Sequence, residues 1–204
     1  FAGGGLADLP SAWASGRADA LSCCLALDAA PLPTTPDQAV LASTLASVRR
    51  DAAIGAPLLE RAARLGVGVC LDAYERACDG VFSCEQNVIL LDADLSDGLR
   101  TAILVHELRH VDQAAAGYRM DMDLGVHEAR TLLCACEADA QAMATWFAWR
   151  ARALNSRPLK RAASALSSQL STATLAAKPA MWRRLCWRVG VPFSTTACGL
   201  SANR

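Results

Sequence analysis

The chain has 204 residues, 20 basic and 20 acidic side chains, and a formal net charge of zero. This length suits one compact domain, and a 53% hydrophobic content excludes an intrinsically disordered chain. No run of about 18 uninterrupted apolar residues occurs, so the sequence predicts no transmembrane segment, and neutrality by itself argues against a nucleic-acid partner.

The chain opens with a region that we predict to be irregular, residues 1–35, which contains three glycines in succession and several prolines. A helix is expected from there to about residue 50, because Thr35 is a favourable N-cap and Pro36 suits the first helical position. A second, short helix is predicted over 57–65, where Gly66 would end it.

The hydrophobic pattern then changes from helical to strand-like. Residues 67–71 and 87–91 are short apolar runs bounded by turn residues, so they are predicted to be strands. Beyond them the pattern is helical over about 99–116, 127–154, 158–176 and 179–188. These elements predict an α+β fold, predominantly helical, with a small sheet before the central helices. We expect a core at 36–154 and a basic helical segment at 155–204.

The zero net charge is a cancellation between two parts of the chain. Residues 1–149 carry all 20 acidic side chains and ten arginines, whereas residues 150–204 carry ten basic side chains and no acidic one. The simplest expectation is that the basic segment packs on the acidic core, with tryptophans helping to close it (Trp146, Trp149, Trp182, Trp187). The alternative is that this segment lies on an anionic membrane or on nucleic acid.

Residues 106–110 read His-Glu-Leu-Arg-His, the pattern HExxH. On a helix, His106 and His110 project from one face, so both imidazoles can reach one metal ion. Glu107 lies one residue further round the helix and can approach a metal-activated water as a general base without binding the metal. The motif therefore predicts a catalytic zinc site.

A catalytic zinc site needs a third protein ligand. Glu137 is the preferred candidate, because a carboxylate among small and apolar residues is costly to bury unless it is paired or bound to metal. Its helical face carries mostly small residues, which would let a second helix approach closely. Asp139 and His127 remain as alternatives.

The residues that support a resemblance to a known family are His106-Glu107-Leu108, His110 and Gln113 on one helix and Glu137-Ala138-Asp139 on the next. Over about residues 66–150 the chain resembles a gluzincin, the zincin metallopeptidase class with two His and one Glu as zinc ligands. More narrowly, it resembles small bacterial metallopeptidases with HELxHxxQ and EAD motifs.

This resemblance implies a zincin-like fold and a peptide or protein substrate that runs along a strand, with residues 87–91 as its counterpart here. Thermolysin-like gluzincins carry an Asp four residues after the ligand Glu to orient a histidine. That position is Gln141 in this chain, which can accept a hydrogen bond but supplies no charge.

If the chain hydrolyses peptides, Glu107 takes the proton of the attacking water and passes it to the leaving amine. Three side chains are candidates for stabilising the oxyanion: Tyr118, Arg109 and His127. For Tyr118 the simpler role is packing, and for Arg109 it is a position on the surface or in an ion pair. The alternative function is a catalytically weak or inactive zincin-like domain that binds metal or a partner.

Nine cysteines, an odd number with no C-x-x-C pair, favour buried thiols over a disulfide framework.

The chain begins at Phe1, so a preceding signal peptide would not be visible. The cytoplasm is slightly favoured and secretion stays open. The alanine and arginine bias is typical of a GC-rich bacterial genome, and the oligomeric state is left open.

Overall fold

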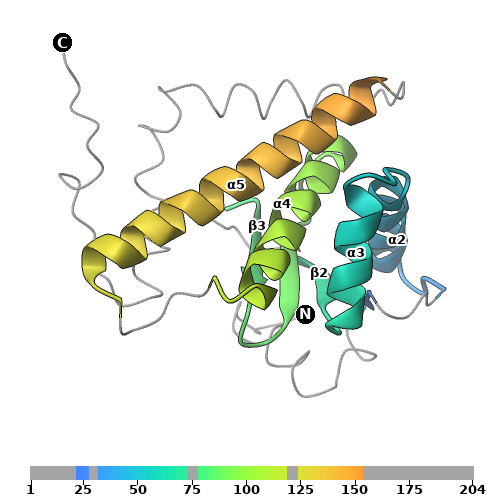
Figure 1. Cartoon of the computed structure of the whole chain (residues 1–204). Helices are drawn as coiled ribbons and strands as arrows, with labels where there is room; N and C mark the ends of the chain where they lie inside the picture. The colour runs from blue at the N-terminus through green and yellow to red at the C-terminus, as the bar shows by residue number, and fades with distance from the viewer. Residues whose placement is uncertain (1–21, 28–31, 73–77, 119–123, 154–204) are drawn as a thin grey trace, which may run out of the picture.

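The computed structural model describes residues 22–27, 32–72, 78–118 and 124–153. This part of the chain is α+β and mostly helical, as predicted, with four helices and a small mixed sheet (Figure 1). The helices are α2 (Pro36–Arg49), α3 (Gly55–Arg64), α4 (Asp97–Ala115) and α5 (Val126–Ala153). The strands are β1 (Cys24–Ala26), β2 (Gly68–Asp72), β3 (Gly80–Ser83) and β4 (Val88–Asp92).

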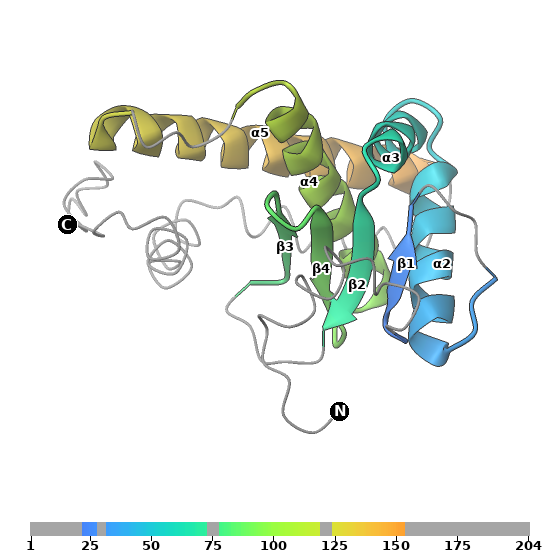
Figure 2. The same ribbon diagram turned by 90° about the horizontal axis from the view of Figure 1, so that it is seen from below.

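The sheet has the strand order β1-β2-β4-β3 (Figure 2). The central pair is parallel, with Gly68 opposite Val88. The two outer strands run antiparallel to their neighbours, β1 to β2 and β3 to β4. Helices α2 and α4 pack against the sheet, and α5 runs alongside α4 and continues beyond it (Figures 1 and 2).

Side chains alternate between the two faces of the sheet, as the twofold period of a strand requires. One set packs under the helices in the main core, and it includes Leu25, Val69 and Ile89. The other set, on the opposite face, includes Cys70 and Leu90. Because both faces of the central strands are buried, β2 and β4 appear in the sequence as continuous apolar runs rather than as alternating ones.

The local signals for α2 are confirmed. Thr35 is its N-cap, and the Thr35 side chain accepts a hydrogen bond from the backbone N–H of Gln38 at 3.2 Å. Pro36 occupies the first turn, where its missing N–H costs nothing. The other predicted helices and strands up to residue 154 lie within two residues of their expected limits. The helices predicted over 158–176 and 179–188, and the basic segment 155–204 to which they belong, lie outside the described residues.

The helix pair α4–α5 is close-packed because small residues meet between the two helices. Ala102 of α4 is fully buried with Ala144 and Ala148 of α5, as expected from the small-residue face that carries Glu137. At the far end of α5, the Arg150 guanidinium bonds the Asp51 carboxylate at 3.1 Å, while Asp51 also accepts two backbone N–H bonds before α3. Helix α5 is thereby fixed against the rest of the core.

The expectation of an irregular region up to residue 35 is wrong for residues 24–26, and the expectation of thiols rather than disulfides is wrong for one pair of cysteines. Residues 24–26 form strand β1 rather than irregular structure. Antiparallel pairing of β1 with β2 places Cys24 directly opposite Cys70, and these two cysteines form a disulfide. They lie 46 residues apart in the chain, so only strand pairing shows that their side chains share a face.

Two further expectations are corrected. The strand expected to run along a substrate, residues 87–91, corresponds to β4, which is paired on both sides by β2 and β3 and has no open edge. Trp146 and Trp149 do not close the core, because they are 50% and 64% exposed. They lie on the outer side of α5, and Trp146 lies under the Arg150 guanidinium at 6.0 Å.

Among the described residues, no helix is long and apolar enough to cross a lipid bilayer.

Candidate metal centre

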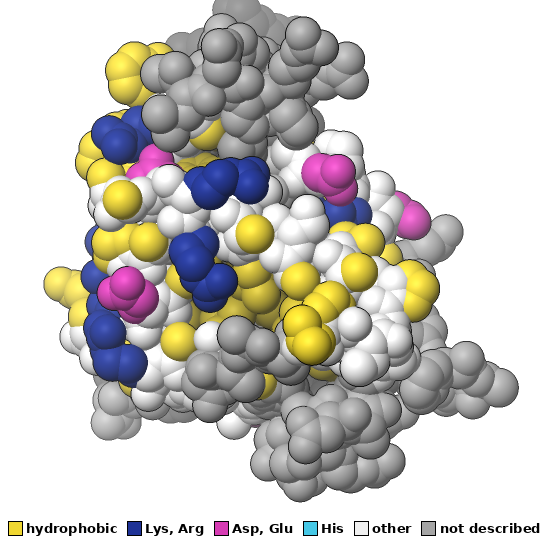
Figure 3. Space-filling model, turned by 90° about the vertical axis from the view of Figure 1, so that its right-hand side faces the viewer, with side chains coloured by type: hydrophobic (Ala, Val, Ile, Leu, Met, Phe, Trp, Pro, Cys, Tyr) yellow, Lys and Arg dark blue, Asp and Glu magenta, His cyan; other side chains and the backbone are white. Residues whose placement is uncertain are grey.

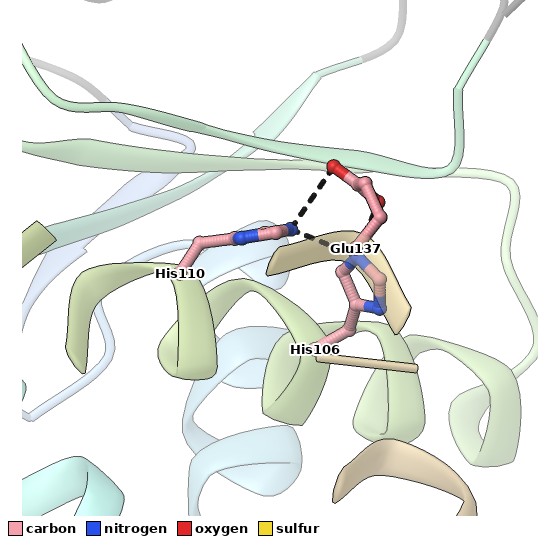
Figure 4. A group of neighbouring side chains, drawn as sticks. All are labelled: His106, His110 and Glu137. Carbon is pink, nitrogen blue, oxygen red and sulfur yellow. Dashed lines mark hydrogen bonds and ion pairs between the residues drawn. The ribbon is translucent and has the colours of Figure 1, made fainter. Parts of the chain in front are cut away.

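Three side chains from two helices converge on one point (Figure 4). His106 and His110, four residues apart on α4, bring their Nε2 atoms within 3.0 Å of each other. Glu137 of α5 reaches over them, with one carboxylate oxygen 3.4 Å from His106 Nε2 and the other 3.4 Å from His110 Nε2. The three side chains are 13% to 22% exposed, so the cluster stays open to water on one side.

These separations fit a small divalent metal ion. Zinc takes nitrogen and oxygen ligands at about 2.0–2.1 Å, and in a tetrahedron the ligand atoms then lie about 3.3–3.4 Å apart. The observed spacing of 3.0–3.4 Å is close to this value. With three protein ligands, such an ion keeps a fourth position for water or substrate, which is the composition of a catalytic rather than a structural site.

The electrostatics of the cluster also call for a cation. Burial raises the pKa of Glu137, but hydrogen bonds to His106 and His110 and their charges outweigh it, so this pKa lies well below its usual range. Burial lowers the pKa of His110, but the hydrogen bond with Glu137 and the charges of Glu107 and Glu137 outweigh it and raise the pKa of His110 to about 9. In the metal-free protein a proton therefore supplies the positive charge that a metal ion would bring.

The His110 ring is held in one orientation by Gln113. Nδ1 of His110 lies 2.8 Å from the amide oxygen of Gln113. The Gln113 amide nitrogen donates to the Cys136 carbonyl at 2.9 Å and to the Asp139 carboxylate at 2.7 Å. Both of these partners are acceptors only, so the amide oxygen must face His110, and Nδ1 of His110 must donate to it. Nε2 is then the nitrogen that can bind a metal.

Charged side chains surround this contact. Arg109 donates to Asp139 at 2.7 Å and to Asp112 at 3.0 Å. Asp112 in turn accepts from Arg61 of α3. The hydrogen bond from Arg109 lowers the pKa of Asp139, so Asp139 is a carboxylate when it accepts from Gln113. Arg109 therefore has the ion-pair role expected from the sequence.

Glu107 lies beneath the cluster, where α4 touches strand β3. It is 5% exposed, and burial raises the pKa of its carboxyl group, although the charges of His106 and His110 and a hydrogen bond from the Phe82 backbone N–H act in the opposite direction. Gly80 makes this close approach possible. A Cβ at that position would lie 2.6 Å from Cγ2 of Ile103 and 3.1 Å from a carboxylate oxygen of Glu107.

Of the three ligand candidates from the sequence, Glu137 joins the histidines and the other two do not. Asp139 faces Arg109 and Gln113 instead. His127 is exposed at the start of α5, ten residues before Glu137, which is about 15 Å along the helix. Tyr118 follows α4 and is 60% exposed, so it is not a packing residue.

Gln141 does not have the expected neighbours. Among the described residues its amide nitrogen is buried with no hydrogen-bond partner, and the side chain that bonds a histidine is Gln113. The sequence indicates the contact between His110 and Gln113, because Gln113 lies three residues after His110 and side chains at this spacing meet on a helix. Gly80 was also missed, because nothing in the sequence indicates which helix a lone glycine would face.

The cluster lies away from the face formed by α2 and α3. Figure 3, which views that side, shows basic side chains and no histidine among the described residues. Two histidines and one carboxylate on adjacent helices form a group that could hold a metal ion. Three such ligands are the set found at catalytic metal sites of hydrolytic enzymes.

The comparison with protein families agrees with this class. Residues 17–181 match a family described as "Putative metallopeptidase family (DUF6782)", and the chain belongs to this family. The search of curated proteins and the search of solved structures gave no match. The family and the His-His-Glu cluster together indicate a metal-dependent peptidase.

Proposed function

We propose that the protein is a zinc-dependent metallopeptidase of the gluzincin type, with His106, His110 and Glu137 as ligands. The observation that carries this proposal is the convergence of two imidazole nitrogens and one carboxylate at 3.0–3.4 Å beside a buried glutamate from the same HExxH helix. A bound zinc ion would supply a Lewis acid that polarises the substrate carbonyl and makes water nucleophilic near neutral pH.

Glu107 is the proposed general base. Its burial raises its pKa and so brings the carboxylate closer to the range in which it can take a proton from water and release it again. As water adds to the peptide carbonyl carbon, Glu107 accepts the water proton. It then delivers this proton to the amide nitrogen as the C–N bond breaks, so the products are a carboxylic acid and an amine, which become carboxylate and ammonium by proton exchange.

The substrate would lie along β3 rather than β4. Strand β3 is at the edge of the described sheet and touches α4 at Glu107. Asp92 N–H bonds the Asp79 carbonyl, so in the antiparallel β3–β4 ladder the backbone groups of Gly80 and Phe82 point away from β4. The Phe82 N–H bonds Glu107, so an added strand would pair with the other outward groups of these two residues. An extended peptide could add there as a further strand, beside the proposed base.

The test is a comparison of Glu107→Gln with the unmutated protein and with Glu60→Gln, a change at an exposed glutamate on α3. Each protein is loaded with zinc, and hydrolysis of a fluorogenic peptide library and the zinc content are measured. Glu107→Gln should lower kcat by about 10²–10⁴-fold, the usual contribution of a general base, and keep one zinc. Glu60→Gln should change neither quantity.

Two outcomes would contradict the proposal. If Glu107→Gln keeps the rate of the unmutated protein, Glu107 is not the base. If the unmutated protein binds zinc at the cluster but cleaves no peptide in the library, the alternative of a zincin-like binding domain is supported instead.

A further inference from the structure

We propose that Gln113 is the positioning residue of the metal centre, and that it fixes His110 and Glu137 at the same time. This inference rests on the proposed function and adds a specific role for a residue that touches neither metal nor substrate. Gln113 is 6% exposed, and the three hydrogen bonds that its side chain makes to described residues go to groups around the cluster.

The first part of the role concerns His110. The Gln113 amide oxygen accepts from Nδ1 of His110 at 2.8 Å, so in the neutral imidazole Nε2 is the nitrogen without a proton and can bind a metal. The amide cannot rotate into the opposite orientation, because its nitrogen would then face Nδ1–H and its oxygen would face the Cys136 carbonyl and the Asp139 carboxylate. The two contacts on α5 therefore determine the tautomer of a histidine on α4.

The second part concerns Glu137. Gln113 bonds the backbone carbonyl of Cys136 and the side chain of Asp139, the residues just before and two after Glu137. These bonds hold one turn of α5 against α4 on both sides of the ligand. Glu137 can therefore reach both histidines because its own segment of helix is fixed by the residue that orients His110.

The charged neighbours keep this arrangement in place. Asp139 is held by Arg109, and Arg109 is also bonded to Asp112. The negative charge of Asp139 is therefore paired with an arginine, and the hydrogen bonds that link Asp139 to His110 pass through the neutral Gln113 amide. This differs from a direct histidine–carboxylate contact, in which the charge lies next to the imidazole.

The test uses three variants and one matched control. Gln113→Leu removes all three hydrogen bonds with little change in volume. Gln113→Glu keeps an acceptor for His110 but places two carboxylates together. In the double variant Gln113→Glu/Asp139→Asn, the new amide at 139 can donate to residue 113 and accept from Arg109. Gln141→Leu is the control, because Gln141 is a glutamine on α5 whose buried amide nitrogen has no partner among the described residues.

The readouts are the zinc dissociation constant, from competition with a chelator, and the visible spectrum of the cobalt-substituted protein. Gln113→Leu should weaken zinc binding by about 10–100-fold, the usual effect of removing a partner of a metal-bound histidine. Gln113→Glu should also weaken it. The double variant should bind more tightly than Gln113→Glu and show a cobalt spectrum near that of the unmutated protein, while Gln141→Leu should match the unmutated protein in both.

The possible failures are distinguishable. If the unmutated protein binds no zinc, the proposed function is wrong, and the Gln113 inference is overturned with it. If the unmutated protein binds zinc and Gln113→Leu binds it equally well, only the inference is overturned. A double variant that binds no more tightly than Gln113→Glu would also overturn it, because the exchange of amide and carboxylate would then have no effect.

Discussion

The close contact between strand β3 and helix α4 makes Gly80→Ala a sensitive test of how Glu107 is positioned. A Cβ at residue 80 would lie 2.6 Å from Cγ2 of Ile103 and 3.1–3.2 Å from the Glu107 side chain. Ordinary carbon contacts are about 3.5–4.0 Å, so the overlap with Ile103 is about 1 Å. Overpacking of this kind costs about 1–3 kcal/mol, and β3 or Glu107 must move.

The expected consequences are a lower free energy of unfolding, by about 1–3 kcal/mol, and a larger loss of activity than of metal binding. A displacement of about 1 Å in a reacting group can lower the rate about 10²-fold. Unfolding in urea gives the first quantity, and peptide hydrolysis by the zinc-loaded protein with its zinc content gives the second. The zinc content should stay unchanged, because the atoms nearest to a Cβ at residue 80 belong to Ile103 and Glu107, neither of which is a proposed ligand.

A double-mutant cycle with Ile103→Ala separates the two contacts. Removal of the Ile103 side chain eliminates the 2.6 Å overlap but leaves the contact with Glu107. The destabilisation of Gly80→Ala/Ile103→Ala should therefore be smaller than the sum of the two single effects, while the activity stays low. If Gly80→Ala alone has the stability and kcat of the unmutated protein, the reasoning about β3 and Glu107 is refuted.

Two further predictions concern the metal and the disulfide. In the metal-free protein burial lowers the pKa of His110, but contact with Glu137 and the charges of Glu107 and Glu137 outweigh it and raise this pKa to about 9. His110 is therefore protonated at pH 7.5, and zinc binding should release about one proton. Calorimetry in buffers of different ionisation enthalpy measures the number of protons released, and a value of zero would contradict the prediction. Replacing both cysteines of the Cys24–Cys70 disulfide with serine should lower the free energy of unfolding by about 4 kcal/mol, the chain-entropy estimate for a separation of 46 residues. Urea denaturation of the oxidised protein and the double variant checks this, and equal stabilities would show that the disulfide does not constrain the unfolded chain.

Several features of the fold could be predicted because they depend on residues close together in the chain. The Thr35-Pro36 pair defines the start of α2 through a hydrogen bond that spans three residues. The spacing of His106 and His110 places both imidazoles on one side of α4 whatever surrounds the helix. Glu137 could be preferred as the third ligand because a carboxylate on a small, apolar helix face is costly to leave unpaired.

Other features required the packing of segments that are distant in the sequence. Strands β1 and β3 are too short to have a clear pattern of their own, and they exist because β2 and β4 provide partners. The Cys24–Cys70 disulfide depends on the register of one of those pairs. Neither local propensity nor hydrophobic period carries information about register between strands.

The surroundings of the metal cluster show the same division. The sequence by itself determined the HExxH helix and named Glu137, since helical spacing and the cost of burying a charge are local properties. The spacing on α4 indicates that Gln113 can meet His110. Only the tertiary structure decided that the Gln113 amide turns its oxygen toward His110, because its nitrogen bonds Cys136 and Asp139 on α5. Which residues of α5 face Gln113 depends on how the two helices pack, with Ala102 buried against Ala144 and Ala148, and this is a property of their contact and not of either sequence segment alone.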